Sequence, residues 1–242
     1  MLGTVVVTAS AGTFPGLIEA LRSVPVAVEE RPLMSFASPL DWSPVDRAIA
    51  ELSRFDAVAV TSPRAARAFA ERLGPGPALG SAWAAGSGTA AALGAALGPV
   101  RTPPADEVGR HGAAAALARA MLEAGVRGPV LFPCGEVRRE ELPARLRAEE
   151  IEVTEVVCYR SVLAGEIAAR EAAERARVLL VASPSVADLL ARACPPGVRP
   201  AMLAVGPTTA AAARASGWPP AAVASRPTVS ALVGGVRSLF AR

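Results

Sequence analysis

Lysine, asparagine and glutamine are absent from the 242-residue sequence, so all 25 basic residues are arginine. The absence of lysine excludes enzymes that hold a substrate as a Schiff base on a lysine amine. Every basic side chain is instead a planar guanidinium, which suits carboxylates and phosphates. With 22 acidic residues the net charge is only +3, and the arginines are scattered along the chain. A charge this small, without a basic stripe, argues against a nucleic-acid-binding protein.

Cysteine and histidine are also scarce. The cysteines, Cys134, Cys158 and Cys194, lie far apart and form no C-x-x-C pair. This spacing argues against a disulfide framework and a zinc site. The only histidine, His111, precedes an alanine-rich segment. We expect it to be a solvated residue at a helix start; the alternative is a substrate contact.

Long hydrophobic runs are missing too. Apolar residues make up 52% of the chain, enough for a globular core, but no run reaches the roughly 20 residues of a membrane span. The first residues, MLGTVVVTASAG, lack the positive flank and long apolar core of a signal peptide. We therefore expect a cytoplasmic protein.

Short apolar runs alternate with helical patterns along the whole chain. The alternation predicts parallel sheets covered by helices, an α/β architecture. Eight predicted strands, each apolar enough to be buried on both faces, lie at 3–8, 26–30, 56–62, 81–86, 128–133, 151–159, 177–183 and 201–206. Predicted helices begin near Thr13, Pro44, Pro63, Ser87, Gly109, Arg138, Glu166, Pro184, Pro207 and Thr228.

The chain contains an internal repeat. AVAVTSPRAARAFAERL (57–73) matches VLLVASPSVADLLARAC (178–194), and WAAGSGTAAAL (83–93) matches LAVGPTTAAAA (203–213). In addition, GTVVVTASAGTFPGLIEAL (3–21) corresponds to GPVLFPCGEVRREELPARL (128–146). The repeated segments therefore follow the order A1–B1–A2–B2. A1 (3–21) and A2 (128–146) are similar to each other, and B1 (57–93) is similar to B2 (178–213). Segment A1 is too short to fold alone, so it joins either B1 or B2, and chain order does not decide between them.

Hydroxyl and glycine residues follow the predicted strands, where ligands of open parallel sheets bind. One interpretation is helix capping, with Ser62 and Ser183 as N-caps before a proline. The other is anion binding, because Gly86 and Gly206 leave backbone N–H groups uncovered at positive helix ends. Each helix end contributes only about 0.3–1 kcal/mol to binding of a carboxylate. Several such ends would suit a large polyanion in a cleft between two domains.

Familiar catalytic motifs are not found. The GSGT loop lacks the lysine of a P-loop, and neither glycine loop has the G-x-G-x-x-G pattern. Ser62 and Ser183 have no histidine to activate them, and no paired catalytic carboxylates are visible. The residues alone therefore indicate a two-domain α/β protein that binds a polyanion without using a strong base.

At these residues the sequence resembles the uroporphyrinogen-III synthase family. The resemblance rests on VTSPRAARAF with AGSGTAAAL, on CGEVRREELPARL with a strand ending in CYRSV, and on VASPSVADLL with AVGPTTAAAARASGW and the tail SRPTVSALVGGV. These blocks cover most of the chain in the order of the family.

The resemblance implies two flavodoxin-like domains that are related by the repeat and joined by a two-stranded linker. Segment A1 would pair with B2, so that residues 1–36 and 165–242 form one domain and 37–164 the other. The implied enzyme is a hydro-lyase that cyclises hydroxymethylbilane, inverting ring D and releasing water, with no cofactor and no metal. Two partners are implied. One is this linear tetrapyrrole, which carries eight carboxylates, and the other is the deaminase that makes it, which would be bound only transiently. We expect a monomer that binds neither nucleic acid nor membranes.

The resemblance also assigns site residues. Tyr159, the only tyrosine, would be the acid that assists departure of the substrate hydroxyl; the alternative is a linker tyrosine packed between the domains. Expected substrate-binding residues are Thr8, Ser62, Arg64, Gly86, Ser87, Thr89, Arg138, Arg139, Ser183, Ser185, Gly206, Thr208 and Thr209.

Two positions depart from the family pattern. Ala9 and Cys134 stand where arginine is usual, which removes two carboxylate partners. Arg64, Arg138 or Arg160 could take their place. The departures leave a second function open, namely a synthase-like domain that has lost turnover and senses a polyanionic metabolite.

Overall fold

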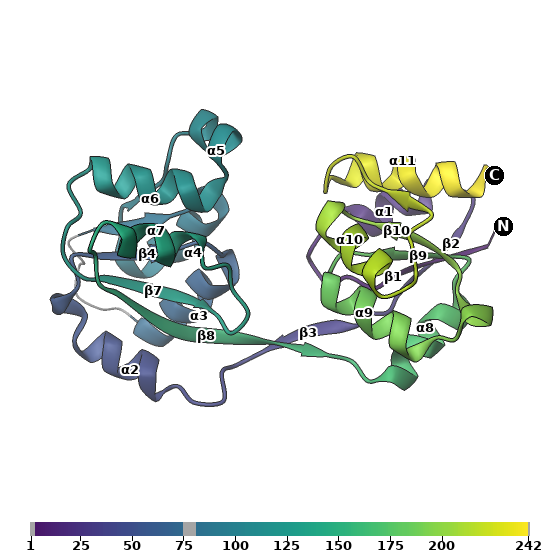
Figure 1. Cartoon of the computed structure of the whole chain (residues 1–242), viewed down its shortest axis with the longest axis horizontal. Helices are drawn as coiled ribbons and strands as arrows, with labels where there is room; N and C mark the ends of the chain where they lie inside the picture. Colours follow the sequence, from purple (N-terminus) through teal and green to yellow (C-terminus); the bar gives the residue numbers. More distant parts are fainter. Residues whose placement is uncertain (1–2, 75–80, 242) are drawn as a thin grey trace. The chain divides into compact units, whose positions relative to one another are not determined.

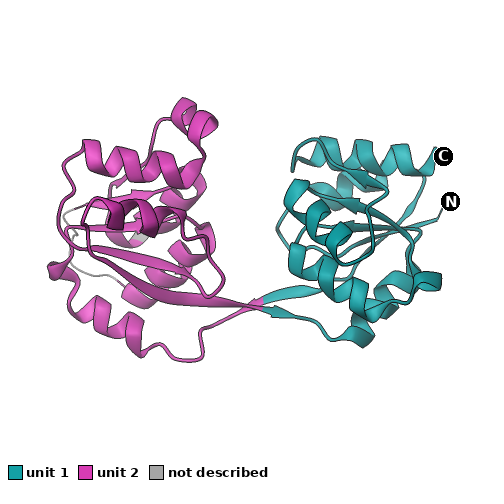
Figure 2. Ribbon diagram, in the orientation of Figure 1, with its two compact units in different colours: residues 1–35, 162–242 teal, residues 36–161 magenta. Residues whose placement is uncertain are grey.

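The computed structural model describes residues 3–74 and 81–241. Contacts between Cα atoms divide the chain into two compact units (Figure 2): unit 1 is Met1–Ser35 with Val162–Arg242, and unit 2 is Phe36–Ser161. The chain passes between the units within two strands, β3 (Met34–Ala37) and β8 (Val153–Leu163). The expected domain limits, 1–36 with 165–242 and 37–164, lie at most three residues from these positions.

Unit 1 is built on a five-stranded sheet with the order β11-β10-β9-β1-β2, in which all neighbouring strands are parallel. Along the chain its elements (Figure 1) are β1 (Thr4–Val7), α1 (Leu17–Arg22), β2 (Ala27–Glu30), α8 (Glu166–Arg175), β9 (Val178–Val181), α9 (Pro184–Ala193), a 3-10 turn (Pro196–Val198), β10 (Ala201–Ala204), α10 (Pro207–Ala215), β11 (Ala222–Val223) and α11 (Val229–Phe240).

Helices cover both faces of this sheet. On one face, Val5 and Val7 pack with α1 and α11. On the other, Val6 packs with α8, α9 and α10. Three successive β1 residues with exposures of 0–4% explain why this segment is a continuous apolar run rather than an alternating one.

Unit 2 has a six-stranded sheet with the order β3-β8-β7-β4-β5-β6. Its remaining elements are α2 (Ser43–Ala50), a 3-10 turn (Leu52–Arg54), β4 (Ala57–Val60), α3 (Pro63–Leu73), β5 (Ala82–Ala84), α4 (Ser87–Leu97), β6 (Val100–Arg101), α5 (Ala105–His111), α6 (Ala113–Glu123), β7 (Val130–Gly135) and α7 (Glu141–Ala148). Helices α2, α3 and α4 cover one face and α6 and α7 the other.

The repeat in the sequence corresponds to a repeat in topology. If β4, β5 and β6 are matched with β9, β10 and β11, and β7 and β8 with β1 and β2, the two sheets have the same strand order, except that β3 is an additional edge strand of unit 2. The helices on matching faces also correspond, because α3 and α4 match α9 and α10, while α7 matches α1. The predicted α/β class with parallel sheets is confirmed.

Several local predictions differ from the structure. Helix α1 begins at Leu17 rather than near Thr13, because Pro15 and Gly16 precede it and Gly16 has a φ of 79°. The predicted helix near Gly109 is two helices, α5 and α6, separated by Gly112 with a φ of 84°. His111 therefore ends a helix instead of starting one, although it is exposed as expected.

Strand β2 was expected to be buried on both faces, and this prediction is wrong. None of its four residues is fully buried, because β2 lies at the edge of its sheet, with β1 as its only neighbour among the described strands. In the described part of the chain, no helix has the length and apolar character needed to cross a membrane.

Candidate active site

The strand order of unit 2 reverses between β4 and β7, and ligands of open parallel sheets bind beyond the carboxyl ends of the strands at such a point. A cavity of about 360 Å³ lies there. Thr61 and Ser62 line it after β4, Cys134 and Gly135 at the end of β7, and Tyr159 from β8. The rest of its wall is Gly112, Ala113 and Ala114 at the start of α6, Val137, Arg138 and Arg139 from the β7–α7 connection, and Glu141 and Leu142 in the first turn of α7.

Tyr159 owes its position to an irregularity in the sheet. Cys134 pairs with Val157, but the next residue, Gly135, pairs with Tyr159, so Cys158 is an extra residue in β8. This is a β-bulge, which re-aims the side chain that follows it. As a result Cys158 and Tyr159 pack against the same hydrophobic cluster, although adjacent strand residues normally point to opposite faces.

The Tyr159 ring has two neighbours that the sequence did not reveal. Phe36 from β3 meets it edge to face, with ring centroids 5.7 Å apart and an interplanar angle of 76°. Gly135 lies so close that a Cβ atom there would be 2.5 Å from the Tyr159 Cζ atom. The sequence prediction ended this strand at residue 133, so Gly135 was not recognised as a strand glycine, which can mark such a close approach.

Arg64 lies beside these rings. Its guanidinium carbon is 3.5 Å from the centroid of the Phe36 ring and 5.9 Å from that of Tyr159. Burial lowers the pKa of Arg64, partly offset by the nearby Tyr159 phenol, but a guanidinium stays charged in proteins. Among the described residues, neither Arg64 nor Arg139 has a carboxylate partner. Both cations are therefore available to an anionic ligand.

Arg138 is already paired. Its guanidinium binds Glu155, and Arg147 Nη2 donates to the other oxygen of that carboxylate at 2.6 Å. Burial alone would raise the pKa of Glu155, but the hydrogen bonds from the two arginines outweigh it and lower the pKa below 4.5. Arg138 could bind a ligand carboxylate only in competition with Glu155, unlike Arg139.

Cys134 lines the cavity as a neutral group. It is 3% exposed, and burial raises the pKa of its thiol to about 12. A thiol that stays protonated is neither a nucleophile nor a substitute for the arginine usual at this position. Within residues 3–74 and 81–241, no group of three potential ligands could hold a metal ion.

Both serines of the repeat are N-cap residues, as expected, but they differ in side-chain hydrogen bonding. Ser62 Oγ accepts a hydrogen bond from the backbone N–H of Ala65 at 3.1 Å. Ser183, its counterpart in unit 1, makes no such bond. Ser185 is exposed in the first turn of α9.

The two glycine loops have the same pattern of exposure. Gly86 and Gly206 are the N-caps of α4 and α10, and the two residues after each are exposed: Ser87 and Gly88 in one loop, Pro207 and Thr208 in the other. Thr89 and Thr209, which follow, are each only 4% exposed. An approaching ligand would meet the residues ahead of these threonines before the threonines themselves.

Thr8 is held within the sheet of unit 1. It is 1% exposed, and its hydroxyl donates to the carbonyl oxygen of Leu180 at 2.9 Å. The expected binding residues of unit 1 thus follow β1, β9 and β10, three adjacent parallel strands. The expected binding residues of unit 2 are only partly brought together. The cavity is lined by Ser62, Arg138, Arg139 and Tyr159, and Arg64 lies beside Tyr159. The loop with Gly86, Ser87 and Thr89 is not part of the lining.

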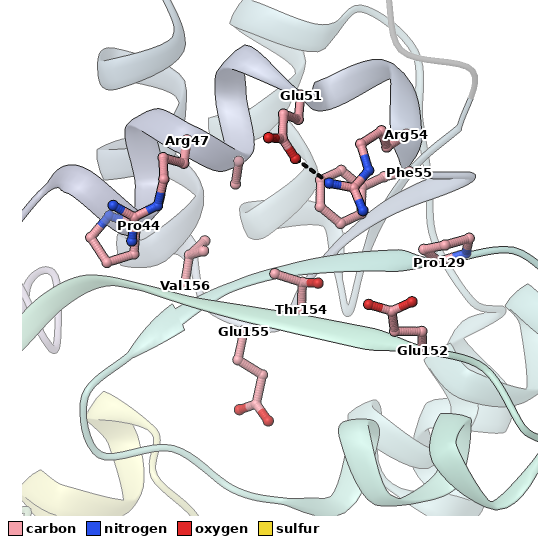
Figure 3. A pocket seen from close by; sticks show the side chains of 11 residues that line it. Pro44, Arg47, Glu51, Arg54, Phe55, Pro129, Glu152, Thr154, Glu155 and Val156 are labelled. Carbon is pink, nitrogen blue, oxygen red and sulfur yellow. Dashed lines mark hydrogen bonds and ion pairs between the residues drawn. The ribbon is translucent and has the colours of Figure 1, made fainter.

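A second concavity of unit 2 contains none of the predicted site residues. It has a volume of about 330 Å³ and lies between α2 and the first half of β8. Figure 3 shows the ion pair of Glu51 with Arg54 on one side of β8 and Glu155 pointing to the other side. The lining of this concavity carries both signs of charge. The concavity includes Pro129 and Glu152, which precede β7 and β8, so it lies toward the amino ends of these strands and not at the carboxyl end of β7, where Tyr159 lies.

Comparison with known proteins decides the family. A sequence model described as uroporphyrinogen-III synthase HemD matches residues 16–234. The chain belongs to the uroporphyrinogen-III synthase family. No curated protein sequence matches it.

Two solved synthase structures share the fold. A uroporphyrinogen-III synthetase from Helicobacter pylori has 19% identity and a TM-score of 0.66, with 98% of this chain and 99% of that chain covered. A mutant uroporphyrinogen III synthase from Thermus thermophilus has 15% identity and a TM-score of 0.62, with 99% of each chain covered. The family assignment supports the synthase as the main interpretation, and no match favours the sensor.

Proposed function

We propose that this protein is a uroporphyrinogen-III synthase that cyclises hydroxymethylbilane, inverts ring D and releases water. The observation that carries the proposal is the cavity at the strand-order reversal of unit 2. Tyr159 and Arg139, which has no carboxylate partner among the described residues, both line this cavity, and the chain belongs to the synthase family. A linear tetrapyrrole with many carboxylates fits the available cations of unit 2, Arg64 and Arg139, and the exposed helix start after β5.

In the proposed reaction, the Tyr159 phenol donates a proton to the hydroxyl group at the ring-A end, and the C–O bond breaks with release of water. The resulting azafulvenium cation is an electrophile, which ring D attacks through its substituted carbon to give a spiro intermediate. The bond from that carbon to the methylene bridge of ring C then breaks, and the released methylene bonds the other α-carbon of ring D, which inverts the ring. The phenolate regains a proton when the new ring aromatises, so no oxidant or reductant is consumed.

Ring closure without inversion is spontaneous, so the protein must above all impose geometry. Orientation of reacting groups can supply about 7–11 kcal/mol of a barrier. This is consistent with the described lining of the cavity, where the thiol of Cys134 is neutral and therefore no nucleophile. Arg139 and Arg64 would hold carboxylate arms while Tyr159 acts at the departing hydroxyl.

We further propose a domain division, a location, an oligomeric state and a reaction class for this protein. The two units would be domains with limits near those expected from the sequence. The enzyme would be a cytoplasmic monomer of the hydro-lyase class that meets the upstream deaminase transiently.

The decisive experiment couples the purified protein to a deaminase that makes hydroxymethylbilane, oxidises the products and separates the porphyrin isomers. Isomer III in excess over the spontaneous background supports the synthase. Exclusive formation of isomer I, together with saturable binding of hydroxymethylbilane, would support the sensor alternative, which the departures at Ala9 and Cys134 suggested.

A further inference from the structure

We propose that Gly135 is a positioning residue for Tyr159: the missing side chain at this strand position creates the space in which the phenol lies. The catalytic part of this inference rests on the proposed function. The geometric part rests on the sheet alone and can be tested without substrate.

The contact is unusually close for two side-chain positions on neighbouring strands. A Cβ atom at Gly135 would lie 2.5 Å from Cζ, 2.7 Å from the hydroxyl oxygen and 2.9 Å from Cε2 of Tyr159. Separations under 3.0 Å are essentially never seen for real Cβ atoms, so the ring would have to move. The atoms involved are the reactive end of the phenol, not its base.

Backbone strain does not explain the glycine. Gly135 is a residue of β7, and its φ lies outside the left-handed region that side chains avoid. Alanine would fit the backbone conformation at this position. The requirement for glycine therefore comes from the space that Tyr159 occupies.

The bulge places Gly135 and Tyr159 opposite each other on neighbouring strands. Because Cys158 is the extra residue, Tyr159 pairs directly with Gly135, and Glu136 N–H donates to the Tyr159 carbonyl oxygen at 2.9 Å. These main-chain bonds fix the start of the tyrosine side chain. An added methyl group could be accommodated only by rotation of the ring, which would disturb its edge-to-face contact with Phe36.

The effect on catalysis follows from the size of the displacement. To relieve a 2.5 Å contact to an ordinary van der Waals separation, the phenol must shift by roughly 1 Å, and a misplacement of that size can cost about 100-fold in rate. A general acid must lie within hydrogen-bond reach of the atom that it protonates, about 2.6–3.2 Å. We therefore expect kcat to fall by about tenfold to 100-fold in Gly135→Ala, with a smaller change in KM.

The first test uses the single tyrosine as a spectroscopic probe. The chain is labelled with 3-fluorotyrosine, which gives one ¹⁹F signal from position 159. Gly135→Ala should shift this signal, and the matched control Gly94→Ala should not, because a Cβ at Gly94 meets only Val100 at 3.9 Å. An unchanged signal in folded Gly135→Ala would overturn the proposed contact.

The second test is a kinetic cycle on the formation of isomer III. If Gly135 acts through the Tyr159 hydroxyl, Gly135→Ala should lower kcat in the wild-type background but by less than about twofold in Tyr159→Phe. Equal effects in the two backgrounds would show that Gly135 acts independently of the phenol and overturn the inference.

A third measurement keeps the inference testable if Gly135→Ala folds poorly. Urea denaturation of this variant is compared in the wild-type and Tyr159→Ala backgrounds, because removal of the ring frees the space. We expect the loss of stability to be largely rescued by Tyr159→Ala, and a loss that is the same in both would count against the inference. If the wild type forms no isomer III while the ¹⁹F and rescue results hold, only the proposed function fails.

Discussion

Replacing Tyr159 with phenylalanine separates the chemical role of the phenol from its role in packing. The ring contacts with Phe36 and Gly135 do not involve a hydrogen bond, and among the described residues the hydroxyl has no hydrogen-bond partner. Removing one oxygen atom should therefore change the free energy of unfolding by less than about 0.5 kcal/mol. The binding contributions of Arg64 and Arg139 should also remain, so KM should change little.

The rate of isomer III formation should respond very differently. A positioned general acid typically contributes a factor of about 10²–10⁴, so we expect Tyr159→Phe to lower kcat by at least about 100-fold, or about 2.7 kcal/mol in the barrier. Spontaneous closure should then raise the share of isomer I. Porphyrin isomers are separated after oxidation at several enzyme concentrations.

A matched control lies on the same strand. Thr154→Val removes a hydroxyl from β8 without approaching Tyr159, in the concavity that contains no predicted site residue. It should keep both stability and rate. A folded Tyr159→Phe protein with the wild-type rate would refute an acid role for the phenol and leave Tyr159 as a packing residue.

Three further predictions concern charges. Arg139→Ala should raise KM for hydroxymethylbilane about tenfold, equivalent to about 1.4 kcal/mol, with kcat nearly unchanged; an unchanged KM at low salt would remove Arg139 from binding. Arg199 donates to the carbonyl oxygens of Ala191, Cys194 and Gly217, so Arg199→Ala should lower the free energy of unfolding by about 2 kcal/mol in urea titrations. The control Arg192→Ala changes an exposed arginine and should leave the stability unchanged; equal effects of the two substitutions would contradict this account. The folded-state pKa of Glu155 is lowered, so the stabilisation by this carboxylate is present above the unfolded pKa near 4.5 and is lost as pH falls through the folded value. The wild type should therefore have a larger free energy of unfolding than Glu155→Gln at pH 7, and the two should become similar in acid. A difference that does not depend on pH would be inconsistent with the ion pairs.

Strands and helices that carry strong local signals were predictable from the sequence. Buried parallel strands appear as apolar runs, and Pro63, Pro184 and Pro207 mark the first residues of α3, α9 and α10. The two-residue strands β6 and β11 were missed, since so short an element has no periodicity to detect. Helix α5 was missed because Gly109 lies inside it, and the sequence prediction placed the helix start there.

The composition of the site was only partly predictable. Tyr159 and Arg139 came from the family resemblance, whereas Phe36 lies more than a hundred residues from Tyr159 and meets it only through the sheet. Periodicity could not reveal the bulge, because an extra residue in β8 leaves the apolar pattern of VTEVVCY unchanged. The pairing of Arg138 with Glu155 likewise depends on the register of β7 and β8, which a single sequence does not specify.

The discontinuity of unit 1 has a consequence for synthesis on the ribosome. Unit 2 is one uninterrupted segment and can complete its sheet once residue 161 has emerged, whereas β1 must wait for β9, more than 170 residues later, to gain its inner neighbour. During most of translation Val6 thus lacks the cover of α8, α9 and α10, and Val5 and Val7 lack that of α11. The newly made β1 segment is therefore open to chaperones and to premature association until β9 has been synthesised.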